Sequence, residues 1–176
     1  LVRDFIEDVY CQYSYSSSIS EAMETVIKQQ KTTWEPGLLK QIMAVAGRDL
    51  LFYIAGHMRR KILDFLIENG YEVDLYGTFW PDELAKHKNV RLENKLVQYG
   101  DALEMFTNYK LTVCPFTNSS DRMLNALLNG CQALTYRMSF VDEELAGCKG
   151  IFQIRDEKTF SEEVSDNIKK ALNETS

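Results

Sequence analysis

The stretch KLTVCPFTNSSDRMLNALLNGCQALTY, residues 110–136, carries the clearest fold signal in the chain. It begins with a short apolar run at Lys110–Cys114, continues through a loop rich in helix-capping residues, and reaches a helical pattern from Ser119 to Leu128. Gly130 follows that pattern as a helix stop, and a second apolar run occupies Cys131–Tyr136. Two short buried strands joined by a helix indicate a parallel β-α-β unit.

The same alternation extends to both sides of this stretch. We predict strands at Leu50–Ala55, Tyr71–Tyr76, Val90–Leu92, Lys110–Cys114, Cys131–Tyr136 and Gly150–Ile154. The intervening helices are expected at Arg59–Asn69, Ala102–Thr107, Ser119–Leu128, Phe140–Leu145 and Thr159–Leu172. Six such strands predict an α/β fold with a doubly wound, Rossmann-like parallel sheet of order 3-2-1-4-5-6.

The first third of the chain has a different, helical pattern. Apolar residues recur at helical spacing through residues 1–33, and a further helix is expected from Pro36 to Gly47. We therefore divide the chain into a helical extension over residues 1–48 and a Rossmann-like domain over residues 49–176.

Composition excludes several classes of function. The 176 residues carry a formal net charge of −6, which argues against a nucleic-acid partner. No apolar run approaches the ~20 residues of a membrane span. The four cysteines form no C-x-x-C pair and there are two histidines, so no metal site is expected. Cys114 and Cys131 are predicted to be buried, and free thiols favour a cytoplasmic protein.

Ligands of open parallel sheets bind beyond the carboxyl ends of the strands, which directs attention to three loops. In the first, Gly56 is expected to permit a tight turn, with His57 beside it and Arg59 and Arg60 opening the next helix. Cations at a helix N-terminus oppose the helix dipole, and a bound phosphate would relieve that conflict. The alternative is that both arginines are solvated surface residues. The third loop, Arg137–Ser139, follows the fifth predicted strand.

The second loop, Pro115–Arg122, is the most informative of the three. Its backbone N–H groups near Ser119 and Ser120, together with Arg122, are expected to form a site for a diphosphate. The alternative is a capped surface turn in which Arg122 pairs with Asp121 or a neighbour.

The segment SDRMLNALLNGCQALT, residues 120–135, resembles the signature of a bacterial glycosyltransferase family. That family includes the spore-maturation-type proteins and is related to group-1 transferases of GT-B fold. The segments 59–63, 71–77 and 99–113 resemble the preceding elements of the same domain, so the resemblance covers roughly residues 49–155.

The resemblance implies a C-terminal, donor-binding domain that holds a nucleoside-diphosphate sugar without a metal or other cofactor. Many retaining members carry two glutamates near this helix, and Thr117 and Asn125 stand at the corresponding positions. These two residues are assigned to ribose or sugar binding, whereas Gly56, His57, Arg59, Arg60, Ser119, Ser120 and Arg122 are assigned to the phosphates. No residue is assigned a catalytic role, and the acceptor site is expected on an upstream domain of the same polypeptide.

Two other functions remain open from the sequence. The chain could be a non-catalytic module that binds a nucleotide or sugar phosphate, or an interaction domain in which residues 1–33 dock a partner. The aromatic segment Gly77–Trp80 either lines the cleft or covers the end of the sheet, and we expect the structural role.

Overall fold

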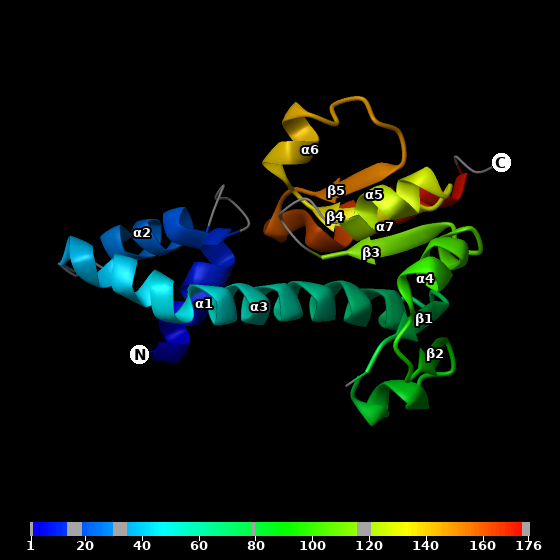
Figure 1. Cartoon of the computed structure of the whole chain (residues 1–176), viewed down its shortest axis with the longest axis horizontal. Helices are drawn as coiled ribbons and strands as arrows, with labels where there is room; N and C mark the ends of the chain where they lie inside the picture. The colour runs from blue at the N-terminus through cyan, green and yellow to red at the C-terminus, as the bar shows by residue number, and fades with distance from the viewer. Residues whose placement is uncertain (1, 14–18, 30–34, 79, 116–120, 174–176) are drawn as a thin grey trace.

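The protein has an α/β fold, seen in a computed structural model that describes residues 2–13, 19–29, 35–78, 80–115 and 121–173. The described elements, in chain order, are α1 (Val2–Tyr13), α2 (Ile19–Gln29), α3 (Pro36–Glu68), β1 (Val73–Tyr76), the 3₁₀ helix η1 (Asp82–Lys86), β2 (Val90–Glu93), α4 (Tyr99–Phe106), β3 (Leu111–Cys114), α5 (Asp121–Leu128), β4 (Gln132–Tyr136), α6 (Ser139–Glu143), β5 (Ile151–Ile154), the 3₁₀ helix η2 (Glu157–Thr159) and α7 (Phe160–Asn173). Figure 1 shows their arrangement around the long helix α3.

The described strands form two parallel sheets, one of two strands in the order β1-β2 and one of three strands in the order β3-β4-β5. Val73 is opposite Val90 in the first sheet, and Leu111 is opposite Gln132 in the second. All five strands match predicted ones, and β4 is buried from Ala133 to Tyr136 as its apolar run indicated. The parallel α/β class is thus confirmed, although six strands are not seen in the described residues.

The predicted strand at Leu50–Ala55 is wrong, because α3 runs through it without interruption. A short apolar run fits a strand or a buried helix equally well, and periodicity over a longer window decides between them. Residues 54, 58, 62 and 66 are four apart, so they lie along one face of a helix, and all four are buried. The separately predicted helices Pro36–Gly47 and Arg59–Asn69 are parts of this one 33-residue helix.

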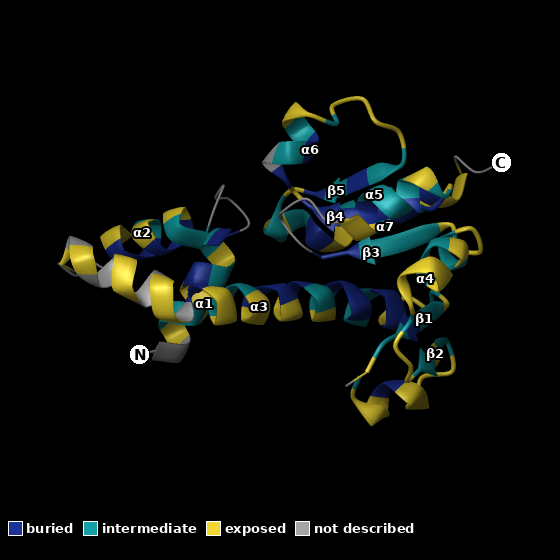
Figure 2. Ribbon diagram, in the orientation of Figure 1, coloured by how far each residue is buried: buried dark blue, intermediate teal, exposed yellow. Residues whose placement is uncertain are grey.

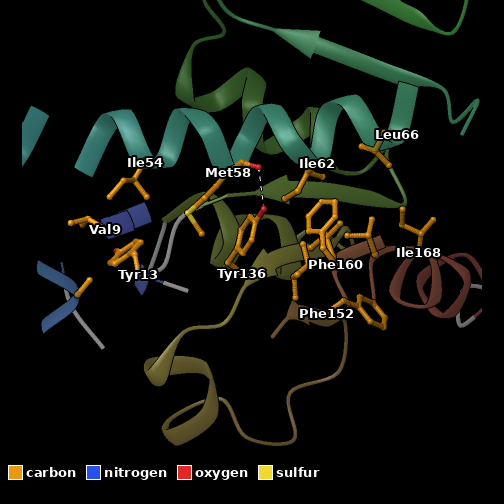
Figure 3. Close-up of a cluster of buried hydrophobic side chains, with 14 of the residues drawn as sticks. Val9, Tyr13, Ile54, Met58, Ile62, Leu66, Tyr136, Phe152, Phe160 and Ile168 are labelled. Atoms are coloured by element: carbon orange, nitrogen blue, oxygen red, sulfur yellow. Dashed lines mark hydrogen bonds between the residues drawn. The ribbon is translucent and has the colours of Figure 1, made fainter. Parts of the chain in front are cut away.

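Helix α3 contributes to the cores of both sheets. Its face at Ile54, Met58 and Ile62 packs with residues of the three-stranded sheet and α7, as Figure 3 shows. A second apolar face, at Leu63 and Ile67, packs in a separate cluster with residues of β1 and η1. Figure 2 shows the helix buried toward the three-stranded sheet and exposed along part of its other side.

Helices cover both faces of the three-stranded sheet. Side chains alternate between the faces of a strand, so Leu134 of β4 packs on the α3 and α7 side whereas Ala133 packs with α5 and α6 residues. The Tyr136 hydroxyl donates to the Met58 carbonyl of α3 across 3.4 Å. Each face of this sheet is therefore closed by a helical layer.

The N-terminal helices α1 and α2 pack on the other end of α3. Val9 and Tyr13 of α1 and Met23 of α2 are buried in the same cluster as the α3 face described above. Helical structure in the described parts of residues 1–33 is confirmed, whereas the predicted boundary at residue 48 falls inside α3 and the division into domains stays a prediction. Within the described ranges, no helix has both the length and the apolar character that a membrane crossing requires.

Candidate functional site

An open cleft of about 320 Å³ lies beyond the carboxyl end of β1. One wall comes from α3 and the other from the segment that follows β1 and leads into η1. The described lining residues are Gly56, Arg59, Arg60, Thr78, Trp80, Pro81 and Leu84. Three of the four predicted phosphate-binding residues on α3, Gly56, Arg59 and Arg60, thus line a common cleft, but it follows the strand predicted as second and not the one predicted as first.

The arginines on α3 do not open a helix, contrary to the prediction. Arg59 and Arg60 lie more than twenty residues after Pro36, where the helix begins, so the helix dipole gives them no special affinity for an anion. Gly56 is likewise in the helix interior, with no tight turn. Arg60 forms an ion pair with Asp64, one turn later, with 2.7 Å between Nε and Oδ1.

Arg59 is the more unusual of the two arginines. It is partly buried, and this burial together with the positive charge of Arg122 lowers the pKa of its guanidinium. Arg122 is the second residue of α5, the helix that follows β3 in the chain, and it is exposed. The positive charge of Arg122, from a distant part of the sequence, thus acts on Arg59, although Arg122 is not among the described lining residues of the cleft. An anion near both groups would stabilise both charges.

Trp80 forms the aromatic part of the opposite wall. Its indole Nε1 donates to the Tyr76 carbonyl across 3.1 Å, and its ring lies 5.9 Å from the Arg59 guanidinium carbon. Gly77 has φ of +117°, and a Cβ added there would lie 3.7 Å from the indole nitrogen. Trp80 also packs with Leu84 in the core of the two-stranded sheet, so it has the expected structural role and lines the cleft as well.

Of the other predicted site residues that the structure describes, His57, Arg122 and Asn125 are not among the described lining residues. The His57 ring lies 4.4 Å from that of Tyr53 and 5.9 Å from that of Tyr10, on the side of α3 that meets α1. Asn125 lies one turn after Arg122 in α5, and its side-chain amide donates to the Tyr99 hydroxyl across 3.2 Å. Thr117, Ser119 and Ser120 lie outside the described residues.

The predicted third loop contributes an ion-pair cluster beyond β4 and β5. Asp142 accepts from Arg137 across 3.0 Å, from Arg155 across 2.8 Å and from Gln153 across 3.0 Å. The hydrogen bond from Gln153 and those from the two arginines lower the pKa of Asp142. Both guanidinium groups are thereby engaged with a carboxylate at this edge of the sheet.

Sequence reasoning missed a polar network that links the two-stranded sheet to the turn before β3. Asp74 accepts from Arg91 across 2.5 Å and from the Tyr109 hydroxyl across 2.6 Å, and the Tyr76 and Tyr109 hydroxyls are 2.7 Å apart. Burial and the hydrogen bond with Asp74 raise the pKa of Tyr109. Opposite charges at adjacent strand positions 74 and 91 were the available signal, but pairing them required the strand register.

The described lining of the cleft is cationic. It includes two cations and one hydroxyl, and no carboxylate or imidazole is among these residues. Nearby Cys114 is buried, as predicted, and burial raises the pKa of its thiol to about 11, although the charge of Arg122 acts in the opposite direction. A neutral thiol is a poor nucleophile. Among the residues that the structure describes, no three His, Cys, Asp or Glu side chains come together to hold a metal ion.

In comparisons with protein-family models, with curated proteins and with solved structures, no match to this chain was found.

Proposed function

We propose that this chain is the donor-binding domain of a glycosyltransferase and binds a nucleoside-diphosphate sugar in the cleft. The observation that carries the proposal is the position of Arg59 in the wall of an open cleft beyond the carboxyl end of a parallel strand, with the positive charge of Arg122 acting on it. Two guanidinium groups can bind the oxygens of a diphosphate through short, charge-assisted hydrogen bonds. The same contacts would stabilise the diphosphate as it leaves the sugar.

The strand arrangement supports a Rossmann-like half of a GT-B fold. Strands β1 to β5 correspond to the predicted second to sixth strands. A sheet of order 3-2-1-4-5-6 places its second strand beside its third, and its fourth, fifth and sixth side by side, as in the two described sheets. Helix α3 lies where the two sheets meet, because it packs with both. The cleft lies beyond the carboxyl end of β1, and open parallel sheets bind their ligands beyond the carboxyl ends of their strands.

A non-catalytic binding module of the same fold is the second candidate. It is favoured by the absence of a carboxylate or imidazole from the described cleft lining. Both candidates bind the same ligand, and they differ in whether the sugar–phosphate bond breaks. An interaction domain that docks a partner through residues 1–33 has less support, because the apolar residues of α1 and α2 are buried against α3.

Calorimetric titration with UDP, GDP, ADP and CDP tests the proposal. We expect at least one of them to bind, and Arg122→Gln to weaken binding about tenfold or more, since a hydrogen bond to a charged group contributes ~1.5–3 kcal/mol. Arg48→Gln is the matched control, because Arg48 is an exposed arginine of α3 outside the cleft. No binding of any diphosphate at millimolar concentration would overturn the proposal, as would equal effects of the two substitutions.

Transfer to an acceptor is expected to need a second domain. A GT-B enzyme holds donor and acceptor in a cleft between two halves, and losing that proximity costs ~7–11 kcal/mol of barrier. The isolated chain should therefore bind donor and hydrolyse it slowly, without efficient transfer. Efficient transfer by this chain alone would refute the half-enzyme proposal, and the absence of any sugar–phosphate cleavage, even beside a second half, would favour the non-catalytic module.

A further inference from the structure

The two walls of the cleft differ in chemistry. Arg59 makes the α3 wall cationic, beside Arg60 in its ion pair with Asp64, whereas Trp80, Pro81 and Leu84 make the opposite wall apolar. The volume of about 320 Å³ lies at the lower end of the roughly 300–1,000 Å³ typical of pockets for small organic ligands. A cleft of this size with one cationic and one apolar wall suits an anion that carries a ring.

The indole of Trp80 is held in place before any ligand arrives. Its nitrogen donates to the Tyr76 carbonyl, and its ring packs in a core with Leu84, which is 1% exposed. A side chain that is already ordered loses little conformational freedom on binding, so more of the stacking energy appears as affinity.

We propose that Trp80 is the stacking surface for the nucleobase of the bound nucleotide, and that the site accepts different bases with similar affinity. This inference rests on the proposed function. The Arg59 guanidinium carbon lies over the Trp80 ring, 5.9 Å from its centre, so a base that stacks on this face takes the place of the guanidinium there and brings its own phosphates within reach of that arginine. One ligand thereby engages both walls.

Broad acceptance of bases follows from what the described lining residues can recognise. Discrimination between bases requires donors and acceptors that pair with the base edge, and amide or carboxylate side chains are the usual choice. Among the described lining residues, none has an amide or carboxylate side chain. The indole N–H of Trp80 already donates to the Tyr76 carbonyl, which leaves Thr78 as the one other uncharged polar side chain among them. Stacking itself is insensitive to sequence, because every base has a π-face.

The first test measures the affinity of the unaltered chain for a series of ligands of increasing size. Pyrophosphate reports the arginines alone, ribose 5-phosphate adds a sugar without a base, and UDP, CDP, ADP and GDP add the base. Each nucleoside diphosphate should bind roughly 5- to 150-fold more tightly than pyrophosphate, which is the affinity equivalent of stacking one base. The four diphosphates should differ from one another by less than about tenfold.

The second test locates the ring. The chain contains two tryptophans, so Trp34→Phe leaves Trp80 as the sole indole fluorophore. In that variant the nucleoside diphosphates should quench the emission and pyrophosphate should not. Trp80→Leu should bring the affinity for UDP close to that for pyrophosphate without changing pyrophosphate binding, with circular dichroism as the check on folding. The fluorescence result stands on its own if this variant does not fold.

The outcomes separate this inference from the proposed function. If neither pyrophosphate nor any nucleoside diphosphate binds, the proposed function fails. If pyrophosphate and the nucleoside diphosphates bind equally and Trp80 emission does not change, the stacking role of Trp80 fails and the diphosphate site stands. If one base is preferred by a hundredfold or more, broad acceptance of bases is overturned.

Discussion

Replacing Gly56 by alanine should stabilise the protein, because this glycine lies in the interior of α3. Its backbone does not take the positive φ that would exclude alanine, and an added Cβ would meet no atom within 4 Å. Glycine in a helix interior costs ~0.5–1 kcal/mol relative to alanine, because the flexible unfolded backbone loses more entropy when it folds. The substitution removes that cost without creating a clash.

The expected increase in stability is small but measurable. For a chain of 176 residues, 1 kcal/mol corresponds to roughly 2–4 °C in melting temperature, so Gly56→Ala should raise Tm by about 1–4 °C. Gly70→Ala is the matched control, because Gly70 is exposed and also has open space around its Cβ position, but its φ is +75°. An L-residue in that conformation costs about 1–2 kcal/mol, so the control should lower Tm.

Both variants are measured without ligand, by thermal and urea denaturation followed by circular dichroism. A two-state fit with an unchanged m-value assigns the shift to stability rather than to a changed unfolded state. A fall in Tm for Gly56→Ala comparable to that of Gly70→Ala would refute the continuous helix. It would instead support a strand at Leu50–Ala55 that ends in a tight glycine turn.

Three further results are expected. Ile62→Ala should destabilise the chain by about 2–5 kcal/mol in urea denaturation, because Ile62 is 0% exposed where α3 meets the three-stranded sheet; a cost below 1 kcal/mol would contradict that packing. Thiol labelling at pH 8, followed by mass spectrometry, should modify the two exposed cysteines at once and spare Cys114 and Cys131 until urea is added. Burial raises the pKa of the Cys114 and Cys131 thiols to about 11. Fast modification of all four cysteines would show that the sites of Cys114 and Cys131 open. Asp142→Asn should lower stability at pH 7, and the difference from the unaltered chain should shrink as the pH falls below about 4. The pKa of Asp142 is lowered in the folded state, so its carboxylate stabilises the fold while it is ionised and stops doing so once acid protonates it. A difference that stays constant with pH would exclude the ion pairs as the cause.

The five described strands could be predicted because each is a short apolar run between turn residues. Cys131–Tyr136, for example, follows Gly130 and becomes the buried central strand of its sheet. Leu50–Ala55 has the same local appearance, but its apolar residues continue the four-residue spacing that leads to Met58 and Ile62. The error came from reading Gly56 as a turn when nothing in its surroundings requires one.

The assignment of the site residues to a ligand stays a prediction. Arg59 and Arg122 were assigned to the same ligand, and the charge of Arg122 acts on Arg59, but the argument from a helix N-terminus fails for Arg59. Trp80 was expected to be only structural, because the sequence gives its position after a strand but not the neighbour across the cleft. Contacts between residues so far apart in the sequence depend on the packing of α3 against both sheets, and no local sequence pattern predicts that packing.

The sharing of α3 between two cores has a consequence for how the protein opens. At 1.5 Å per residue, its 33 residues extend about 50 Å, from the N-terminal helices to the two-stranded sheet. Neither sheet can lose its contact with this helix without disturbing the other, so the backbone amides of residues 54–67 should exchange with solvent only through global unfolding. A chain shortened to begin at residue 49 would cut through the helix and remove α1 and α2, which help to bury Ile54, and it should unfold more readily throughout rather than lose a separable domain.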